Sequence, residues 1–252
     1  MSDAYRSPCL LVHGLTASPT QLDPVRKVLE VVGCPVEAPL LSGHGTKVED
    51  LIGLQWEDWY HDVLVTAEQL RTVYPLRDRQ LFYVGMSFGA LLGLKLAIDH
   101  PDWLKGLVCI GPPLTMFPWM NIIHPLLTYT PLRWIIRAWP KDYDKAVADP
   151  EGREVYRRSS YAQFPLSAVR EVRRLQSAVR RDLHKVTTPL LLIHARQDLT
   201  APPEAVSMIA RGVRSSVVEQ MWCERSSHVA TLDYERDAIA ARIVEFLHHQ
   251  AP

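Results

Sequence analysis

Residues 81–98 read LFYVGMSFGALLGLKLAI, and this stretch decides the fold. Its first four residues, 81–84, are apolar and predict a β-strand that is buried on both faces. Residues 90–98 are apolar almost all round and stop shortly before a proline, which predicts a helix packed centrally against a sheet. The five residues between them, 85–89, must therefore make a sharp turn from strand to helix.

The turn carries the pattern G-x-S-x-G, with Ser87 at its centre. In the context of strand, turn and helix this pattern is typical of a nucleophile elbow, where glycines are needed because side chains at 85 or 89 would collide with the adjoining strand or helix. From 12 Gly and 14 Ser in 252 residues, roughly 0.03 chance matches are expected. Ser87 is therefore the candidate nucleophile.

Outward from this turn, short apolar runs alternate with longer helical patterns along the chain. That alternation predicts an α/β fold, with a mostly parallel sheet of about six strands flanked by helices. The expected strands span residues 8–12, 34–38, 81–84, 107–110, 190–194 and 217–221. Further helices are expected at residues 56–74, 169–186 and 239–247.

A serine hydroxyl needs a base, usually a histidine that a carboxylate orients. In a parallel sheet, catalytic groups gather in loops just after the strands. Asp198 follows the strand predicted at 190–194, and His228 follows the one predicted at 217–221. The chain order Ser87, Asp198, His228 is the order expected for a nucleophile elbow of this kind.

The other histidines have competing interpretations. His13 and His44 adjoin glycines in tight turns, so we expect them to be hydrogen-bonded structural residues. His194 is an alternative base, but an imidazole embedded at a strand end cannot easily swing to Ser87. The remaining histidines lie in predicted helices or in the segment described next, and we expect them to face solvent.

Residues 112–150 interrupt the alternation with seven of the 19 prolines, three of the seven tryptophans and no glycine. The prolines predict short helices, and the apolar surface exceeds what a linker needs. The segment is either a helical subdomain packed on the core or a cap over a binding cleft. We expect residues 1–111 and 186–252 to form the core, with residues 112–185 forming a helical cap insertion and a return helix.

Five pieces of the chain carry a family resemblance: LVHGLT at 11–16, LSGHG at 41–45, the turn at Ser87, the loop at Asp198 and SHV at 227–229. With them the sequence resembles the α/β-hydrolase superfamily, most of all its bacterial carboxylesterase and monoacylglycerol lipase branch. It departs from the family where the first strand stands almost at the N-terminus. It departs again at Ala90, where relatives often carry glycine. The alanine should tighten the turn slightly.

The resemblance implies an oxyanion hole formed by the backbone N–H groups of Leu15 and Phe88. It implies a serine hydrolase that cleaves uncharged carboxylic esters, such as monoacylglycerols or short to medium acyl esters, through an acyl-enzyme. Alternatives are a thioesterase or acyltransferase with the same triad, or a ligand-binding module without turnover. Neither a cofactor nor a metal is implied, because metal-binding, phosphate-binding and dinucleotide motifs are missing from the sequence.

The composition limits the classes of partner and the cellular location that we expect for this chain. Lys and Arg total 28 against 28 Asp and Glu, without a basic block, so a nucleic-acid partner is not expected. Four dispersed cysteines and a start without signal-peptide features predict a reducing, cytoplasmic location, and no apolar run is long enough for a membrane span. The arginines of residues 169–186 predict a solvated basic face or weak peripheral contact with an anionic membrane.

Overall fold

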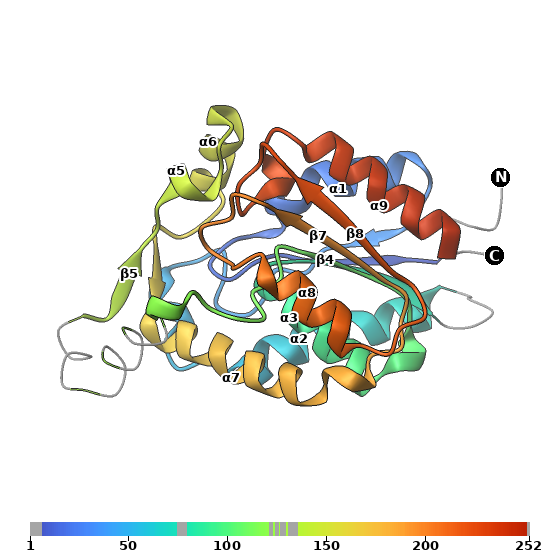
Figure 1. Cartoon of the computed structure of the whole chain (residues 1–252), viewed down its shortest axis with the longest axis horizontal. Helices are drawn as coiled ribbons and strands as arrows, with labels where there is room; N and C mark the ends of the chain where they lie inside the picture. The colour runs from blue at the N-terminus through green and yellow to red at the C-terminus, as the bar shows by residue number, and fades with distance from the viewer. Residues whose placement is uncertain are drawn as a thin grey trace.

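The structure, a computed structural model, describes residues 7–74, 80–120, 123, 126, 130 and 136–250. Its main sheet has six strands, all parallel, in the order β2-β1-β3-β4-β7-β8 (Figure 1). The predicted α/β fold with a parallel sheet of six strands is thus confirmed. The strands are β1 (Cys9–Val12), β2 (Val36–Glu37), β3 (Leu81–Met86), β4 (Leu104–Ile110), β7 (Leu190–Ala195) and β8 (Val218–Cys223).

Two strands, β2 and β4, differ most in length from the prediction. β2 has only two residues, because Pro35 and Pro39 flank it and proline cannot donate to a ladder, which is tolerated at a sheet edge. β4 begins at Leu104, three residues early, and Gly106 pairs with Phe82 although it interrupts the apolar run. The pairing partner, rather than local hydrophobicity, thus sets the start of β4.

Helices cover both faces of the sheet (Figure 1). Alternate residues of β1 show why both are needed, since Leu10 packs with α2, α3 and α7 while Leu11 packs with α1 and α9. The α-helices are α1 (Asp23–Val31), α2 (Trp56–Val73), α3 (Phe88–Asp99), α5 (Tyr143–Ala146), α6 (Pro150–Arg158), α7 (Leu166–Asp182), α8 (Glu204–Gly212) and α9 (Arg236–Gln250). Short 3-10 segments are Pro19–Leu22, Val48–Leu51, Pro101–Trp103, Leu183–Lys185 and Ala230–Leu232.

Local sequence explains the helices nearest the site. α2 begins with a capping box between Gln55 and Asp58, and the predicted apolar stripe is buried along it. α3 is buried along almost its whole length, as predicted for a central helix. No helix among those described has both the length and the apolar character needed to cross a membrane.

The turn between β3 and α3 is backbone packed on backbone. A Cβ atom at Gly85 would overlap the carbonyl group of Gly89, and a Cβ atom at Gly89 would overlap the carbonyl oxygen of Val12 in β1. Ser87 between them has a φ of 52°, in the region that side chains rarely adopt. Ala90 is accommodated, since it is fully buried against the core.

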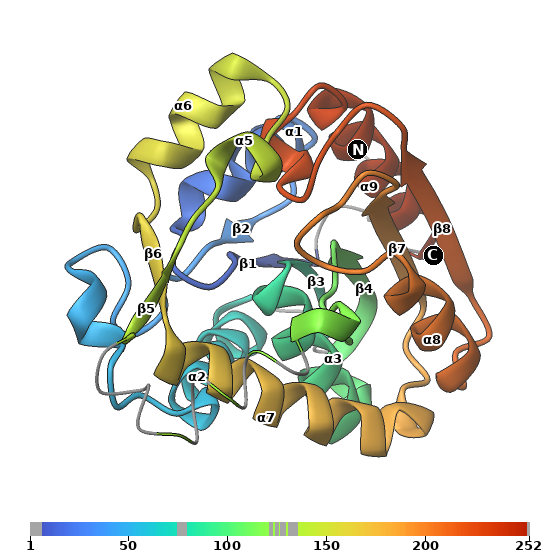
Figure 2. The same ribbon diagram turned by 60° about the vertical axis from the view of Figure 1, so that its left-hand side comes forward.

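The segment between β4 and β7 contains an element that was not predicted. β5 (Ala138–Pro140) and β6 (Gln163–Pro165) form a two-stranded antiparallel ribbon. Of the seven prolines that predicted short helices, Pro140 lies in β5, and β6 contains Pro165; a two-stranded ribbon leaves one edge of each strand unpaired, where proline is tolerated. In Figure 2 the ribbon runs from α7 to α5 and α6, which lie toward the carboxyl ends of the sheet strands.

We expect Gly89→Ala to destabilise the fold by about 3 kcal/mol or more, because the added methyl group meets a backbone oxygen that cannot rotate away. Gly33→Ala is the control: Gly33 has a φ of 83° and open space around it, so the change should cost only about 1–2 kcal/mol. Urea unfolding curves measure both. Equal losses would contradict the proposed close packing at the turn.

Candidate active site

Ser87 lies at the carboxyl end of β3, where the chain enters α3. Its N–H donates to Ile110 O at 2.8 Å, so the turn is also tied to the end of β4. The left-handed φ is a strained conformation that the packed strand and helix on either side maintain. The side chain thereby projects from the edge of the sheet and lines a cavity.

His228 and Asp198 reach Ser87 from loops that follow β8 and β7. His228 Nε2 lies 2.9 Å from Ser87 Oγ, and His228 Nδ1 lies 2.7 Å from Asp198 Oδ2. The other carboxylate oxygen, Oδ1, accepts the N–H groups of Thr200 (2.7 Å) and Ala201 (2.8 Å). The structure thus brings the three predicted side chains into one hydrogen-bonded chain.

The Asp198 carboxylate is held in its charged form. Burial raises the pKa of Asp198. Attraction to His228, the hydrogen bond from that ring and the hydrogen bond from Ala201 N–H together lower the pKa by more than burial raises it, so it lies below its ordinary value. A charged carboxylate accepts hydrogen bonds, so His228 Nδ1 carries the proton. His228 Nε2 is then free to accept the Ser87 proton.

The two predicted oxyanion donors lie on either side of this turn. Phe88 is the first residue of α3, a position whose N–H lacks an intrahelical acceptor. Leu15 stands between two anchored amides: Gly14 N–H donates to Gln21 Oε1 at 2.7 Å, and Thr16 N–H donates to His44 Nε2 at 2.9 Å. Among the described residues, neither the Leu15 nor the Phe88 amide has a protein acceptor.

Their side chains differ in role. Leu15 lines the cavity, whereas the Phe88 ring is buried against Trp59, with ring centroids 5.3 Å apart. The Leu15 side chain thus belongs to the cavity wall and the Phe88 side chain to the core.

His13 and His44 hold the loop that contains Leu15. Burial, with a smaller contribution from His44, lowers the pKa of His13 to about 3, and burial lowers the pKa of His44 to about 4. Both rings are therefore neutral and accept backbone hydrogen bonds, His13 from Leu41 N–H (3.2 Å) and His44 from Thr16 N–H (2.9 Å). This is the structural role predicted for them.

His194 lies behind the site. Its Nε2 is 3.8 Å from Asp198 Oδ2, and burial lowers its pKa. Among the described residues, the imidazole hydrogen-bonded to Ser87 is that of His228, so the geometry gives His194 no route to the base role.

Two anchors of the site were missed by sequence analysis. Tyr161 donates its N–H to Thr16 O at 2.8 Å, and its hydroxyl donates to Gly43 O (2.8 Å) and accepts from Thr46 N–H (2.9 Å). It ties the segment after α6 to the loop beside Leu15. More than 100 residues separate these partners, so no local pattern could have revealed the contact.

Asp233 is the second anchor. This fully buried carboxylate accepts N–H groups from Ala148 (2.8 Å) and Asp149 (2.9 Å) on one side, and from Ser227 (2.8 Å) on the other. It therefore fastens the segment between α5 and α6 to the residue next to His228. Other acidic residues lie near Asp233 in the sequence, so no sequence pattern distinguished Asp233 from them.

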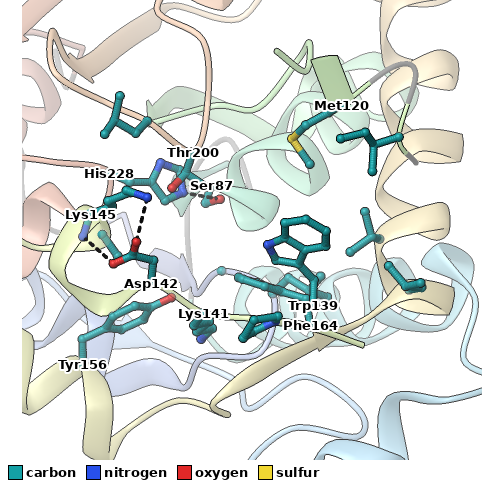
Figure 3. Close-up of a pocket in the computed structure, with 18 of the residues that line it drawn as sticks. Ser87, Met120, Trp139, Lys141, Asp142, Lys145, Tyr156, Phe164, Thr200 and His228 are labelled. Carbon is teal, nitrogen blue, oxygen red and sulfur yellow. Dashed lines mark hydrogen bonds and ion pairs between the residues drawn. The ribbon is translucent and has the colours of Figure 1, made fainter. Parts of the chain in front are cut away.

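Above Ser87 lies a cavity of about 320 Å³ (Figure 3). Aromatic and aliphatic side chains dominate its wall, and most come from the segment between β4 and β7. Those side chains are Trp119, Met120, Ile123, Trp139, Tyr156, Phe164, Leu166 and Val169, and the charged ones are Lys141, Asp142 and Lys145. Among the described residues, no cluster of three or more His, Cys, Asp or Glu side chains is arranged to hold a metal ion.

Of the apolar residues expected in this segment, Ile123 lines the cavity and Leu126 is 51% exposed. Ile122, Leu127, Trp134 and Ile135 lie outside the described residues.

A parallel sheet that ends at a Ser, His and Asp chain defines an α/β-hydrolase. The family model described as "Serine aminopeptidase, S33" matches residues 3–235, so the chain belongs to this family of α/β-hydrolases.

Three comparisons with known proteins agree on the class of enzyme. The chain is 28% identical to a thermostable monoacylglycerol lipase of Bacillus sp. (strain H-257) over 94% of its own length and 88% of the relative's. It is 25% identical to a carboxylesterase of Bacillus subtilis (strain 168), over 94% and 91%. A solved structure from work on LipS and LipT, two metagenome-derived lipolytic enzymes, superposes with a TM-score of 0.84 at 25% identity, over 97% and 94%. The expected enzyme class, a carboxylic ester hydrolase, is confirmed.

We expect Asp233→Asn to lower the free energy of unfolding by about 1–3 kcal/mol, because the amide turns hydrogen-bond donors toward backbone N–H groups. It should also lower kcat/KM about tenfold or more, because the loop that carries His228 loses its anchor. Asp237→Asn, an exposed neighbour, should change stability by no more than about 0.5 kcal/mol. Urea unfolding and ester hydrolysis test the pair; normal activity in Asp233→Asn would show that the anchor is dispensable for catalysis.

Proposed function

We propose that this carboxylic ester hydrolase cleaves uncharged acyl esters with Ser87 as nucleophile, His228 as general base and Asp198 as the carboxylate that orients His228. The observation that carries the proposal is the pair of hydrogen bonds, 2.9 Å and 2.7 Å long, that joins the three side chains, of which Ser87 and His228 line the cavity. The strained φ of Ser87 supports it, because such strain is concentrated at functional sites.

In this mechanism Ser87 Oγ attacks the ester carbonyl carbon while His228 Nε2 takes the hydroxyl proton. The oxyanion that forms accepts hydrogen bonds from the N–H groups of Leu15 and Phe88. His228 then gives its proton to the departing alcohol, which leaves the acyl group on Ser87. A water molecule, deprotonated by the same imidazole, releases the acid and restores the serine.

The substrates we propose are monoacylglycerols or short to medium acyl esters. The aromatic and aliphatic wall of the cavity suits an acyl chain, since each buried methylene contributes roughly 0.8 kcal/mol. The names of two relatives, monoacylglycerol lipase and carboxylesterase, support carboxylic esters, monoacylglycerols among them, as the substrate class.

We also propose that residues 112–185 act as the cap and return helix over a core of residues 1–111 and 186–252. Side chains of this segment supply most of the cavity wall, which supports the division.

The proposed location is the cytoplasm, because the four cysteines are buried free thiols. Weak contact with an anionic membrane is proposed for the groove that Arg170, Arg173, Arg174 and Arg181 line on α7. Glu57, Glu171 and Asp182 pair with three of these arginines, so any such attraction would be local.

We expect Ser87→Ala to lower kcat/KM for p-nitrophenyl butanoate about a thousandfold or more while the protein stays folded, because only the nucleophile is lost. Ser177→Ala on α7 is the matched control and should keep full activity, since its exposed hydroxyl donates to Arg173 O and Ser177 is not among the residues that line the cavity. Thermal unfolding verifies the fold of both. A folded Ser87→Ala protein with a tenth of the normal rate would exclude Ser87 as nucleophile.

We expect Ile123→Asn to reduce the ratio of medium-chain to acetyl ester activity, because a polar group in the cavity wall penalises each buried methylene. Leu126→Asn changes the same segment at an exposed position and should leave the ratio unchanged. kcat/KM for p-nitrophenyl octanoate and acetate supplies the ratio. If both variants keep the normal ratio, this part of the cap does not select the acyl chain.

A further inference from the structure

One charged side chain in the cavity has no role in the proposed reaction. Lys141 follows β5 and lines the cavity, and its Nζ is buried. Among the described residues this nitrogen has no hydrogen-bond acceptor. Its neighbours are aromatic faces, with the ring centroid of Tyr156 at 4.5 Å and that of Phe164 at 5.1 Å.

A buried ammonium without a counterion is unfavourable, and aromatic faces compensate only in part. Burial accordingly lowers the pKa of Lys141 to about 7. Near neutral pH the group is therefore divided between its charged and neutral forms. An anion bound at Nζ would stabilise the charged form and would itself be stabilised by it.

The charged groups around Lys141 leave this positive charge uncompensated. Asp142, next along the chain, is paired with Lys145 at 2.9 Å. On the opposite loop, His44 is neutral, and the Lys141 charge helps to keep its pKa low. The nearby Tyr143 and Tyr156 carry phenol groups, and burial raises the pKa of Tyr156. Of the cavity wall, Lys141, Asp142 and Lys145 together carry one net positive charge when Lys141 is protonated.

The cavity also has two chemically different sides. Figure 3 shows Met120, Trp139 and Phe164 on one side of Ser87, and Asp142, Lys145 and Tyr156 on the other, with Lys141 at the base between them. The cavity wall thus offers an apolar surface on one side and charged groups on the other, with the Lys141 amine between them.

We propose that Lys141 binds a carboxylate of the substrate, so that the cavity accepts esters carrying a free acid group in addition to uncharged esters. Charge-assisted hydrogen bonds from Nζ to the two carboxylate oxygens would satisfy donors that have no acceptor in the described part of the chain. The inference rests on the proposed function, because the ester bond must lie against Ser87 while the acid group lies at Lys141.

Two matched substrate pairs test the proposal. The first compares p-nitrophenyl hydrogen glutarate with p-nitrophenyl pentanoate and places the carboxylate in the acyl part. The second compares carboxymethyl butanoate with propyl butanoate and places it in the alcohol part. For at least one pair, the ratio of kcat/KM for the acid ester to that for the neutral ester should fall about tenfold or more in Lys141→Met.

Lys185→Met is the control for the loss of one positive charge. Lys185 is exposed and paired with Asp182 in the 3-10 segment after α7, and it is not among the cavity residues. This variant should keep both ratios within about twofold. Met is chosen at position 141 because its length suits the aromatic surroundings without a buried charge.

The same ratio should depend on pH. As the pH rises through the pKa of Lys141, about 7, the amine loses its proton and the preference for the acid ester should fall. An effect of pH on the catalytic step that both esters of a pair share cancels in the ratio. The ratio should be independent of pH in Lys141→Met.

Binding without turnover separates this proposal from the proposed function. In the Ser87→Ala background, calorimetry gives the dissociation constant of each acid ester, and adding Lys141→Met should weaken binding about tenfold for the preferred one. That result supports the carboxylate subsite even if Ser87 is not the nucleophile. Unchanged ratios and unchanged binding for both pairs would overturn the carboxylate subsite. It would also be overturned if Lys141→Met instead lost selectivity for monobutanoylglycerol over propyl butanoate.

Discussion

The close crossing of α3 over the ends of β1 and β3 is the contact on which the rest of the site depends. Gly85 and Gly89 leave no space for a Cβ atom, so helix and strands meet backbone to backbone. That approach imposes the strained φ of Ser87 and lifts its hydroxyl above the sheet edge. It also directs the first N–H of α3 toward the same place. Buried strands and a buried helix on either side offset the strain.

Around this rigid centre, the loops are held by buried side chains that accept backbone N–H groups. His44 holds Thr16, Gln21 holds Gly14, and Asp233 holds Ser227. Such contacts satisfy buried donors that water cannot reach, and they order the loops without covering the cavity. Tyr161, in the segment between β4 and β7, donates to Thr16 O in the loop beside Leu15, and Asp233 accepts from Ala148 N–H in that segment, so the position of the segment and the geometry of the site depend on each other.

Local sequence predicted the elements well where one physical signal dominated. Apolar runs located all six strands, and the glycine pattern located the turn at Ser87, because burial and steric crowding act within a few residues. Prediction was weaker where pairing with another strand decides whether a strand forms and how long it is. The ribbon of β5 and β6 was missed, since its strands are three residues long, contain prolines and lie more than 20 residues apart. The length of β4 was likewise set by its neighbour β3.

The sequence by itself thus determined the parallel sheet, the sharp turn and the identity of the three residues that are joined by hydrogen bonds of 2.9 Å and 2.7 Å. The reason is that local sequence locates the strand ends, and catalytic groups gather in the loops just after the strands of a parallel sheet. Only the tertiary structure decided which side chains line the cavity and how Asp233 and Tyr161 anchor the loops. It also decided that the Lys141 amine is buried without an acceptor among the residues that the structure describes. These are properties of packing between segments that lie far apart in the sequence, such as those of Tyr161 and Thr16. A side chain acquires its burial and its partners only when such segments meet.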